Sequence, residues 1–120
     1  MKKILVVDDD ETIVDLLLEA LQTEDRLIRH ASDGAGALNW TGKETFDLII
    51  CDLMMPGGHG YQLIEQVKAD REAARTKILV LTAKSFRRDA EKARQSGADL
   101  FMSKPFTIAD LTQKVNQLLS

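Results

Sequence analysis

The chain has 120 residues, of which 44% are hydrophobic and 29% are charged, and its formal net charge at pH 7 is −3. This balance is typical of one soluble globular domain, and it lacks the basic excess that marks a nucleic-acid-binding domain. One cysteine cannot form an internal disulfide, the apolar run after the basic start is too short for a signal peptide, and no run approaches the roughly 20 residues of a membrane span. We therefore expect a cytoplasmic domain with no direct contact to nucleic acid or to a membrane.

Apolar runs and helical stripes alternate along the chain. Residues 4–7 form a short apolar run that three aspartates stop, and residues 11–23 then carry apolar side chains at helical spacing. Residues 26–31 are more polar, which predicts a strand near a sheet edge. The later strands are expected at 48–51, 78–81 and 99–102, and the later helices at 35–40, 61–69, 86–95 and 107–119.

Five βα units in succession predict an α/β fold, with a doubly wound, five-stranded parallel sheet in a single domain over residues 1–120. The runs at 4–7, 48–51 and 78–81 are apolar throughout, which indicates strands buried on both faces at the centre of the sheet. Chain chirality predicts right-handed crossovers, whereas the pattern by itself leaves the order of the strands open.

Polar side chains follow four of these strands. The first strand ends in Asp8 and Asp9, the third in Asp52, the fourth in Thr82 and the fifth in Lys104. The carboxyl ends of parallel strands lie on the same edge of a sheet, where ligands bind in open α/β folds. The sequence therefore predicts that three carboxylates, a hydroxyl and an ammonium group converge on one small site.

The charges of this site favour a divalent cation. Three close carboxylates cannot all stay ionised without compensation, and Mg²⁺ suits a site with one or two carboxylates, waters and a phosphate. The carboxylates of Asp8, Asp9 and Asp52 sum to −3, and Mg²⁺ (+2) together with the Lys104 ammonium (+1) balances them. Lys104 and Thr82 would hold further phosphate oxygens. This arrangement indicates phosphoryl transfer, in which a carboxylate can itself be the nucleophile.

Each residue has a simpler interpretation when it is taken alone. Asp10, beside this set, is expected to cap the first helix, Thr82 alone would be a loop hydroxyl, and Lys104 alone would belong to a surface turn. Cys51 is interpreted as a small core residue, and Trp40, whose indole has no evident partner, as packing against the sheet. Four polar strand ends at one sheet edge are harder to explain by coincidence.

Four short motifs together resemble the receiver domain of two-component response regulators. They are Asp8-Asp9 after an apolar strand, Asp52-x-x-Met55-Pro56 with Gly60, Thr82-Ala83, and Lys104-Pro105-Phe106. Their order and spacings agree with that family over essentially the whole chain, and only the loop at residues 57–59 departs from its commonest pattern. The resemblance implies the flavodoxin-like strand order 2-1-3-4-5.

The resemblance also implies roles for the acidic residues. Asp52 would accept a phosphoryl group from the phosphohistidine of a sensor histidine kinase or of a phosphotransfer protein. Asp9 and Asp52, with the backbone carbonyl of Met54, would bind Mg²⁺, and Asp8 would act through water.

A phosphorylation-dependent switch is implied as well. Thr82 would move toward the new phosphate, and Phe101 would swing into the space behind it. The face formed by the fourth helix, fifth strand and fifth helix, within residues 86–119, would then change and would dock a partner or a second copy. The domain would be a switch rather than an enzyme. It would catalyse only its own phosphorylation and a slow dephosphorylation, because neither Met54 nor Lys84 can orient the hydrolytic water.

Two other functions are open at this point. The stretch Asp8-x-Asp10-x-Thr12 fits the nucleophile motif of phosphohydrolases of the haloacid dehalogenase type, in which Asp8 would be phosphorylated. Such hydrolases need a further acidic pair after the lysine, where this chain offers only Asp110. The third function is a receiver-like binding module that is never phosphorylated, and the complete set of acids, threonine and lysine argues against it.

Overall fold

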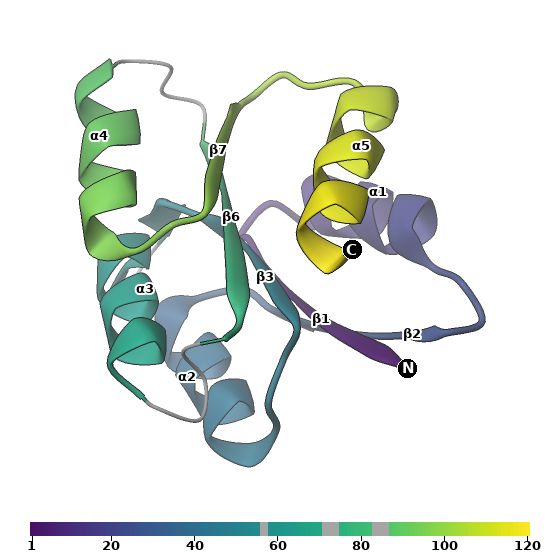
Figure 1. Cartoon of the computed structure of the whole chain (residues 1–120), viewed down its shortest axis with the longest axis horizontal. Helices are drawn as coiled ribbons and strands as arrows, with labels where there is room; N and C mark the ends of the chain where they lie inside the picture. Colours follow the sequence, from purple (N-terminus) through teal and green to yellow (C-terminus); the bar gives the residue numbers. More distant parts are fainter. Residues whose placement is uncertain (56–57, 71–74, 83–86) are drawn as a thin grey trace.

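The computed structural model describes residues 1–55, 58–70, 75–82 and 87–120, and strands alternate with helices along them as expected (Figure 1). The strands are β1 (Lys2–Val7), β2 (Arg26–Ala31), β3 (Leu48–Asp52), β4 (Met54–Met55), β5 (Gly58–His59), β6 (Lys77–Thr82) and β7 (Leu100–Ser103). The helices are α1 (Glu11–Leu21), α2 (Gly34–Lys43), α3 (Gly60–Ala69), α4 (Arg87–Ser96) and α5 (Ile108–Leu119). Among the helices of these residues, none has the length and apolar character to cross a membrane.

Five of the strands form one parallel sheet in the order β2-β1-β3-β6-β7. Counted along the chain, this is the order 2-1-3-4-5 that the resemblance implied, so the predicted doubly wound fold is confirmed. The strands run in register, with Val7 beside Cys51, Asp52 beside Leu81, and Thr82 beside Ser103. One edge of the sheet therefore carries the carboxyl ends from which the site was predicted.

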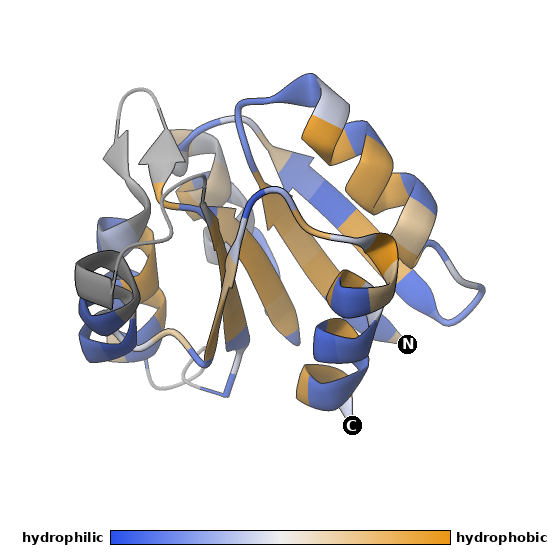
Figure 2. Cartoon of the chain, turned by 90° about the horizontal axis from the view of Figure 1, so that it is seen from above, coloured by the Kyte–Doolittle hydropathy of each residue, from blue (hydrophilic) through white to orange (hydrophobic). Residues whose placement is uncertain are grey.

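Helices cover both faces of the sheet. α1 and α5 lie on one face, and α2, α3 and α4 lie on the other (Figure 1). Leu17 of α1 and Val115 of α5 are fully buried in one core, and Ala37 of α2 and Ile64 of α3 are fully buried in the other. Figure 2 shows the apolar central strands between these two layers. Consequently β3 is buried at all of its positions, whereas the edge strand β2 stays partly exposed, as its polar sequence predicted.

Local sequence signals define the ends of several helices. Three helices begin at a side-chain oxygen that accepts a backbone N–H of the first turn. These pairs are Asp10 with Thr12 at 2.9 Å, Asp33 with Gly36 at 2.7 Å, and Thr107 with Asp110 at 3.1 Å. Gly97 follows α4 at φ 117°, and a Cβ there would lie 2.7 Å from Cγ of Lys68. The predicted cap at Asp10 is therefore confirmed, and Thr107 and Gly97 mark a helix start and a helix end by the same kind of local signal.

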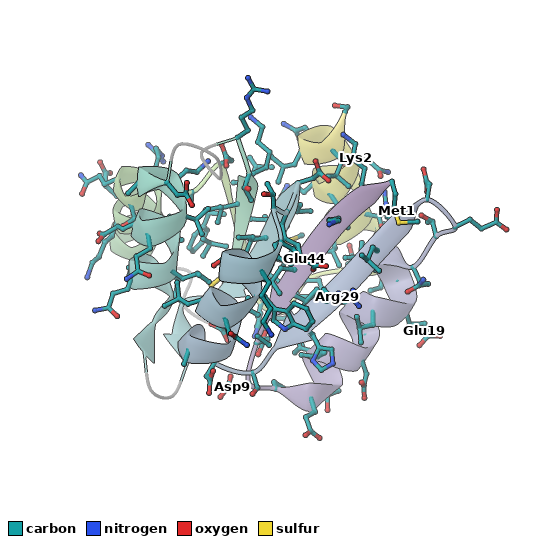
Figure 3. The ribbon with its side chains drawn as sticks, turned by 90° about the horizontal axis from the view of Figure 1, so that it is seen from below. Met1, Lys2, Asp9, Glu19, Arg29 and Glu44 are labelled. Atoms are coloured by element: carbon teal, nitrogen blue, oxygen red, sulfur yellow. The ribbon has the colours of Figure 1, made fainter. Side chains whose placement is uncertain are left out.

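α2 extends to Lys43, three residues beyond its predicted end. A contact of Trp40 explains the additional turn of the helix. Nε1 of the Trp40 indole donates a hydrogen bond to the carbonyl of His30 at 3.1 Å. The guanidinium of Arg29 lies 5.1 Å from the centre of the same ring and 3.5 Å from the Glu44 carboxylate (Figure 3). The expectation that this indole packs against the sheet is confirmed, and it also has partners that the sequence did not reveal.

A second, two-stranded antiparallel sheet follows β3, where the sequence indicated only a loop. Met54 of β4 pairs with His59 of β5, and Met55 pairs with Gly58. Two residues per strand are too few to show an alternating pattern, so periodicity could not reveal this hairpin. It starts two residues after Asp52 and therefore borders the site.

Candidate functional site

The structure brings Lys104 onto two aspartates from other strands. Asp8 follows β1, Asp52 is the last residue of β3, and Lys104 follows β7. Nζ of Lys104 lies 2.7 Å from Oδ2 of Asp8 and 3.1 Å from Oδ2 of Asp52. Since β6 separates β7 from β3 in the sheet, the lysine reaches across the end of β6 to make both contacts. The predicted convergence of these three residues is thus present.

Asp9 completes an acidic group that fits a hard cation. Asp8, Asp9 and Asp52 each offer a carboxylate oxygen, and these three oxygens lie within 4.8 Å of one another. Two ligands on opposite sides of Mg²⁺ would be about 4.2 Å apart, so a small approach, or one ligand acting through water, would form a magnesium site. All-oxygen ligands of this kind favour Mg²⁺ over zinc or copper.

The carboxylate of Asp8 is bonded within the protein at both oxygens. Oδ1 accepts the backbone N–H of Asp10 at 2.9 Å, and Oδ2 accepts the Lys104 ammonium. The side chain is only 2% exposed, and this burial raises the pKa of Asp8 above its ordinary value although the two hydrogen bonds lower it. Keeping Asp8 ionised therefore lowers the free energy of unfolding, and nearby positive charge offsets this loss.

Lys104 supplies that positive charge at neutral pH. Burial by itself would lower the pKa of its ammonium group, but the hydrogen bonds to Asp8 and Asp52 outweigh burial, and the pKa lies above its usual value of 10.5. Asp52 is 7% exposed and Asp9 is exposed, so one carboxylate of the group is enclosed beside the lysine and another faces solvent. The described ionic groups of this cluster leave an excess of negative charge that a divalent cation would balance.

Asp9 lies at one end of a cleft between α1 and α2 that the sequence did not predict (Figure 3). The cleft has a volume of about 580 Å³. Its lining residues are Asp8, Asp9, Glu11, Val14, Asp15, Leu18, His30, Ala31, Ser32, Asp33, Gly36, Asn39 and Trp40. These side chains come from three separate segments whose contact depends on the packing of α1 and α2, so no local pattern could have revealed it.

The structure gives only a backbone position for two predicted site residues. Thr82 is the last residue of β6, and Met54 is the first residue of β4, two positions after Asp52. Their side chains, and all of Ala83 and Lys84, lie outside the described residues. Phe101 lies on β7 and packs, partly buried, against the core that α2 and α3 cover. It also lines a small cavity of about 170 Å³ beside α4.

Cys51 precedes Asp52 on the central strand and is fully buried, which confirms its assignment to the core. Its Sγ–H donates to the Asp52 carbonyl at 3.2 Å. Burial raises the pKa of this thiol far above its ordinary value, and the neighbouring carboxylates of Asp52 and Asp8 raise it further. The thiol therefore stays protonated and contributes packing rather than chemistry.

A parallel doubly wound sheet with acids and a lysine at its carboxyl edge defines a class of phosphate-handling α/β domains. Within this class, a family model for the response regulator receiver domain matches residues 4–116, and the chain belongs to that family. Receiver domains are signalling domains rather than enzymes in the ordinary sense, they bind Mg²⁺ at an acidic pocket, and response regulators interact with histidine kinases or phosphotransfer proteins.

Individual relatives agree with this family. The chain is 36% identical over 119 residues to the chemotaxis protein CheY-3 of Vibrio cholerae, covering 97% of this chain and 90% of that protein. It is 38% identical over 118 residues to the alkaline phosphatase synthesis transcriptional regulatory protein PhoP of Bacillus subtilis, covering 98% of this chain and 48% of that protein. The structure of chemotaxis response regulator CheY4 of Vibrio cholerae superimposes with a TM-score of 0.92 at 30% identity, covering 99% of each chain.

These findings do not favour the alternative of a haloacid-dehalogenase-type hydrolase. The structure gives a physical reason, since the carboxylate of Asp10, the second acid of that motif, is bonded to the Thr12 N–H as a helix cap. A residue with this structural role explains the Asp8-x-Asp10-x-Thr12 match without hydrolase chemistry.

Proposed function

We propose that Asp52 is the phosphoryl acceptor of this receiver domain, and that its phosphorylation switches the domain between two signalling states. The donor is the phosphohistidine of a sensor kinase or a phosphotransfer protein. One oxygen of the Asp52 carboxylate attacks phosphorus while the P–N bond breaks. The electron pair of that bond remains on the imidazole nitrogen, which takes up a proton.

The observation that carries this proposal is that Asp52 shares the Lys104 ammonium with Asp8 and lies in one acidic group with Asp8 and Asp9. It ends the central strand of the sheet, it is 7% exposed, and its Oδ2 lies 3.1 Å from Nζ of Lys104. An ammonium group at this distance neutralises an oxygen of the incoming phosphoryl group and holds it in place, which is how proteins mainly assist such transfers. The exposed Asp9 leaves the site open to solvent and to the donor.

The residues around Asp52 fit the magnesium site of the family. Asp9 and Asp52, with the backbone carbonyl of Met54, would hold the ion directly, and Asp8 would contact it through water, because Lys104 and a backbone N–H already bond both oxygens of Asp8. When bound, Mg²⁺ supplies the positive charge that lets a phosphoryl dianion approach a cluster of carboxylates.

Labelling identifies the acceptor. Purified protein is incubated with a radiolabelled small phosphodonor and Mg²⁺, and the modified residue is located by peptide mapping. We expect label on Asp52, and its loss in Asp52→Asn, which keeps the shape of the side chain but removes the nucleophile. Asp47→Asn is the matched control, because Asp47 precedes the same strand at its opposite end and accepts a hydrogen bond from the Lys3 N–H at 2.8 Å. Label on Asp8, or undiminished labelling of Asp52→Asn, would contradict the proposal.

The signal would pass from the site through β6 and β7. Thr82 ends β6 beside Ser103, and two residues earlier Val80 pairs with Phe101. We propose that the Thr82 hydroxyl turns to the new phosphate and that Phe101 moves inward, which changes the face made by α4, β7 and α5. A partner or a second copy docks on this face. A full change from 1:99 to 99:1 needs about 5.5 kcal/mol of differential stabilisation, which the phosphate and the partner would share.

Beryllofluoride with Mg²⁺ tests this switch, because it imitates the phosphoryl group without turnover. Nuclear magnetic resonance spectra with and without it are expected to differ at Thr82, at Phe101 and along α4, β7 and α5. Sedimentation of the same samples shows whether a second copy docks. Unchanged signals at Thr82 and Phe101, in a protein that is labelled at Asp52, would show that Phe101 is core packing in both states and that the signal takes another route.

A further inference from the structure

The turn between β1 and α1 is held by two hydrogen bonds that meet at Asp10. Its backbone N–H donates to Oδ1 of Asp8 at 2.9 Å, and its side-chain Oδ1 accepts the Thr12 N–H, also at 2.9 Å. The bond to Asp8 ties the turn to the site, and the bond to Thr12 ties it to the helix. Asp9, the exposed acid, lies between Asp8 and Asp10 in the sequence, so its backbone position depends on these two hydrogen bonds.

The side chain of Asp10 fixes the backbone that makes the bond to Asp8. Asp10 has φ −89° and ψ 106°, which is extended backbone outside the helix, and its cap on Thr12 stabilises this conformation against continuation of the helix. The peptide unit between Asp9 and Asp10 carries the N–H that bonds Asp8. If the cap is lost, this unit is held less firmly, and its bond to the Asp8 oxygen that Lys104 does not contact is weakened.

From this geometry we propose that Asp10 is a positioning residue for the metal site. Its cap holds the turn at residues 8–10 so that Asp8 stays on Lys104 and Asp9 stays directed at the ion. This inference rests on the proposed function, because it concerns the magnesium site of that function. The contribution of Asp10 comes from its hydrogen bond and not from its charge, and the two can be separated by substitution.

Three variants make the separation. Asp10→Ala removes both the cap and the charge, whereas Asp10→Asn removes the charge and keeps a capping oxygen. Asp33→Ala is the matched control, because Asp33 caps α2 through the Gly36 N–H at 2.7 Å and also lines the acidic cleft. This control loses one cap and one carboxylate near the site, but it leaves the turn at residues 8–10 unchanged.

Mg²⁺ affinity is measured by following amide chemical shifts during titration with Mg²⁺ alone. We expect Asp10→Ala to bind Mg²⁺ about fivefold more weakly, which corresponds to the loss of a typical helix cap. Asp10→Asn and Asp33→Ala are expected to stay within about twofold of the parent, as for a modest change in charge near a screened site. Without Mg²⁺, the amide proton of residue 10 should exchange faster in Asp10→Ala than in Asp10→Asn, because its bond to Asp8 is weakened.

The outcomes separate this inference from the proposed function. Unchanged affinity in Asp10→Ala, equal weakening in Asp10→Ala and Asp10→Asn, or equal weakening in Asp33→Ala would each overturn the positioning role. If Asp10→Ala does not fold, Asp10→Gly serves instead, because glycine is tolerated at a cap position but has no side-chain oxygen. Parent protein that neither binds Mg²⁺ nor labels at Asp52 would refute the proposed function itself.

Discussion

Replacing Lys104 by methionine tests the charge balance of the site most directly. The ammonium group lies 2.7 Å from Asp8 and 3.1 Å from Asp52, and the three side chains are 16%, 2% and 9% exposed. Methionine fills a similar volume without a charge, so the variant leaves the two carboxylates in place without their shared partner. Removing one member of a buried ion pair typically costs about 3–5 kcal/mol.

The size of this effect follows from the exposure of the lysine. Because its side chain keeps some contact with water, we expect a loss near the lower end of that range, about 3 kcal/mol in the free energy of unfolding at pH 7 without metal. For a domain of this size the loss corresponds to a fall of about 10 °C in Tm.

The loss should depend on pH in a defined direction. Burial already raises the pKa of Asp8 in the folded protein, and without Lys104 this pKa rises further. The pKa of Asp8 is 3.8 in the unfolded chain and higher in the folded protein. Asp8 therefore stabilises the fold while it is protonated, below pH 3.8, and this contribution is lost as the pH rises through its pKa in the folded state. The Lys104→Met deficit is therefore expected to be smaller at pH 4 than at pH 7. The pKa of Lys104 itself is raised above 10.5, so in the parent protein its contribution is present below that pH and persists through neutrality.

Urea unfolding at pH 4 and pH 7 measures the deficit, in chelator and again with Mg²⁺, which should restore part of the lost stability. Lys68→Met is the control, because Nζ of Lys68 contacts the Thr76 carbonyl at 2.8 Å and, among the residues that the structure describes, a single carboxylate, that of Asp99, at 3.2 Å. Its loss should be smaller and should not respond to Mg²⁺. A Lys104→Met deficit that is the same at both pH values, or that Mg²⁺ leaves unchanged, would refute the electrostatic reasoning.

Three further predictions concern the chemistry of the site. Asp9→Asn is expected to abolish labelling from a small phosphodonor, and a chelator is expected to do the same for the parent, since both would remove the metal. Labelling at full rate in chelator would contradict this. Phosphorylated protein should lose its label slowly, and Met54→Asn or Lys84→Glu should shorten the half-life by supplying an amide or a carboxylate that can orient the hydrolytic water; half-lives equal to or longer than the parent value would count against that role. Cys51 should resist alkylation in the folded protein at pH 8 and react after unfolding, since burial raises the pKa of its thiol; reaction of the native protein at the rate of a free thiol would be inconsistent with that burial.

The parts of this fold that the sequence predicted are those that depend on one element or on a rule of topology. Uninterrupted apolar runs indicated the central strands, and the cap at Asp10 is a local signal over three residues. The convergence of Asp8, Asp52 and Lys104 followed because parallel strands end at one edge, whatever their order. The order of the strands in the sheet came from the resemblance, because the central strands are all apolar and their hydrophobic patterns do not show which of them are neighbours.

The parts that the sequence did not predict depend on contacts between elements. α2 was predicted to end at residue 40, and the bond from Trp40 to the His30 carbonyl, which anchors its last turn to β2, is a tertiary contact that a local pattern does not show. The sequence predicted that Lys104 lies near the acids, but its pairing with both Asp8 and Asp52 depends on how the strands pack beside one another. The cleft between α1 and α2 has the same origin.

The position of Trp40 has a practical consequence. It is the single tryptophan of the chain, and it lines the same cleft as Asp8 and Asp9. Indole emission responds to nearby charge and to hydration, and the intrinsic fluorescence of the unmodified protein arises from a residue that lines this cleft. We therefore expect the arrival of an ion, or of a phosphoryl group, to change the emission of this one native side chain, with no dye, label or engineered reporter to disturb the chemistry.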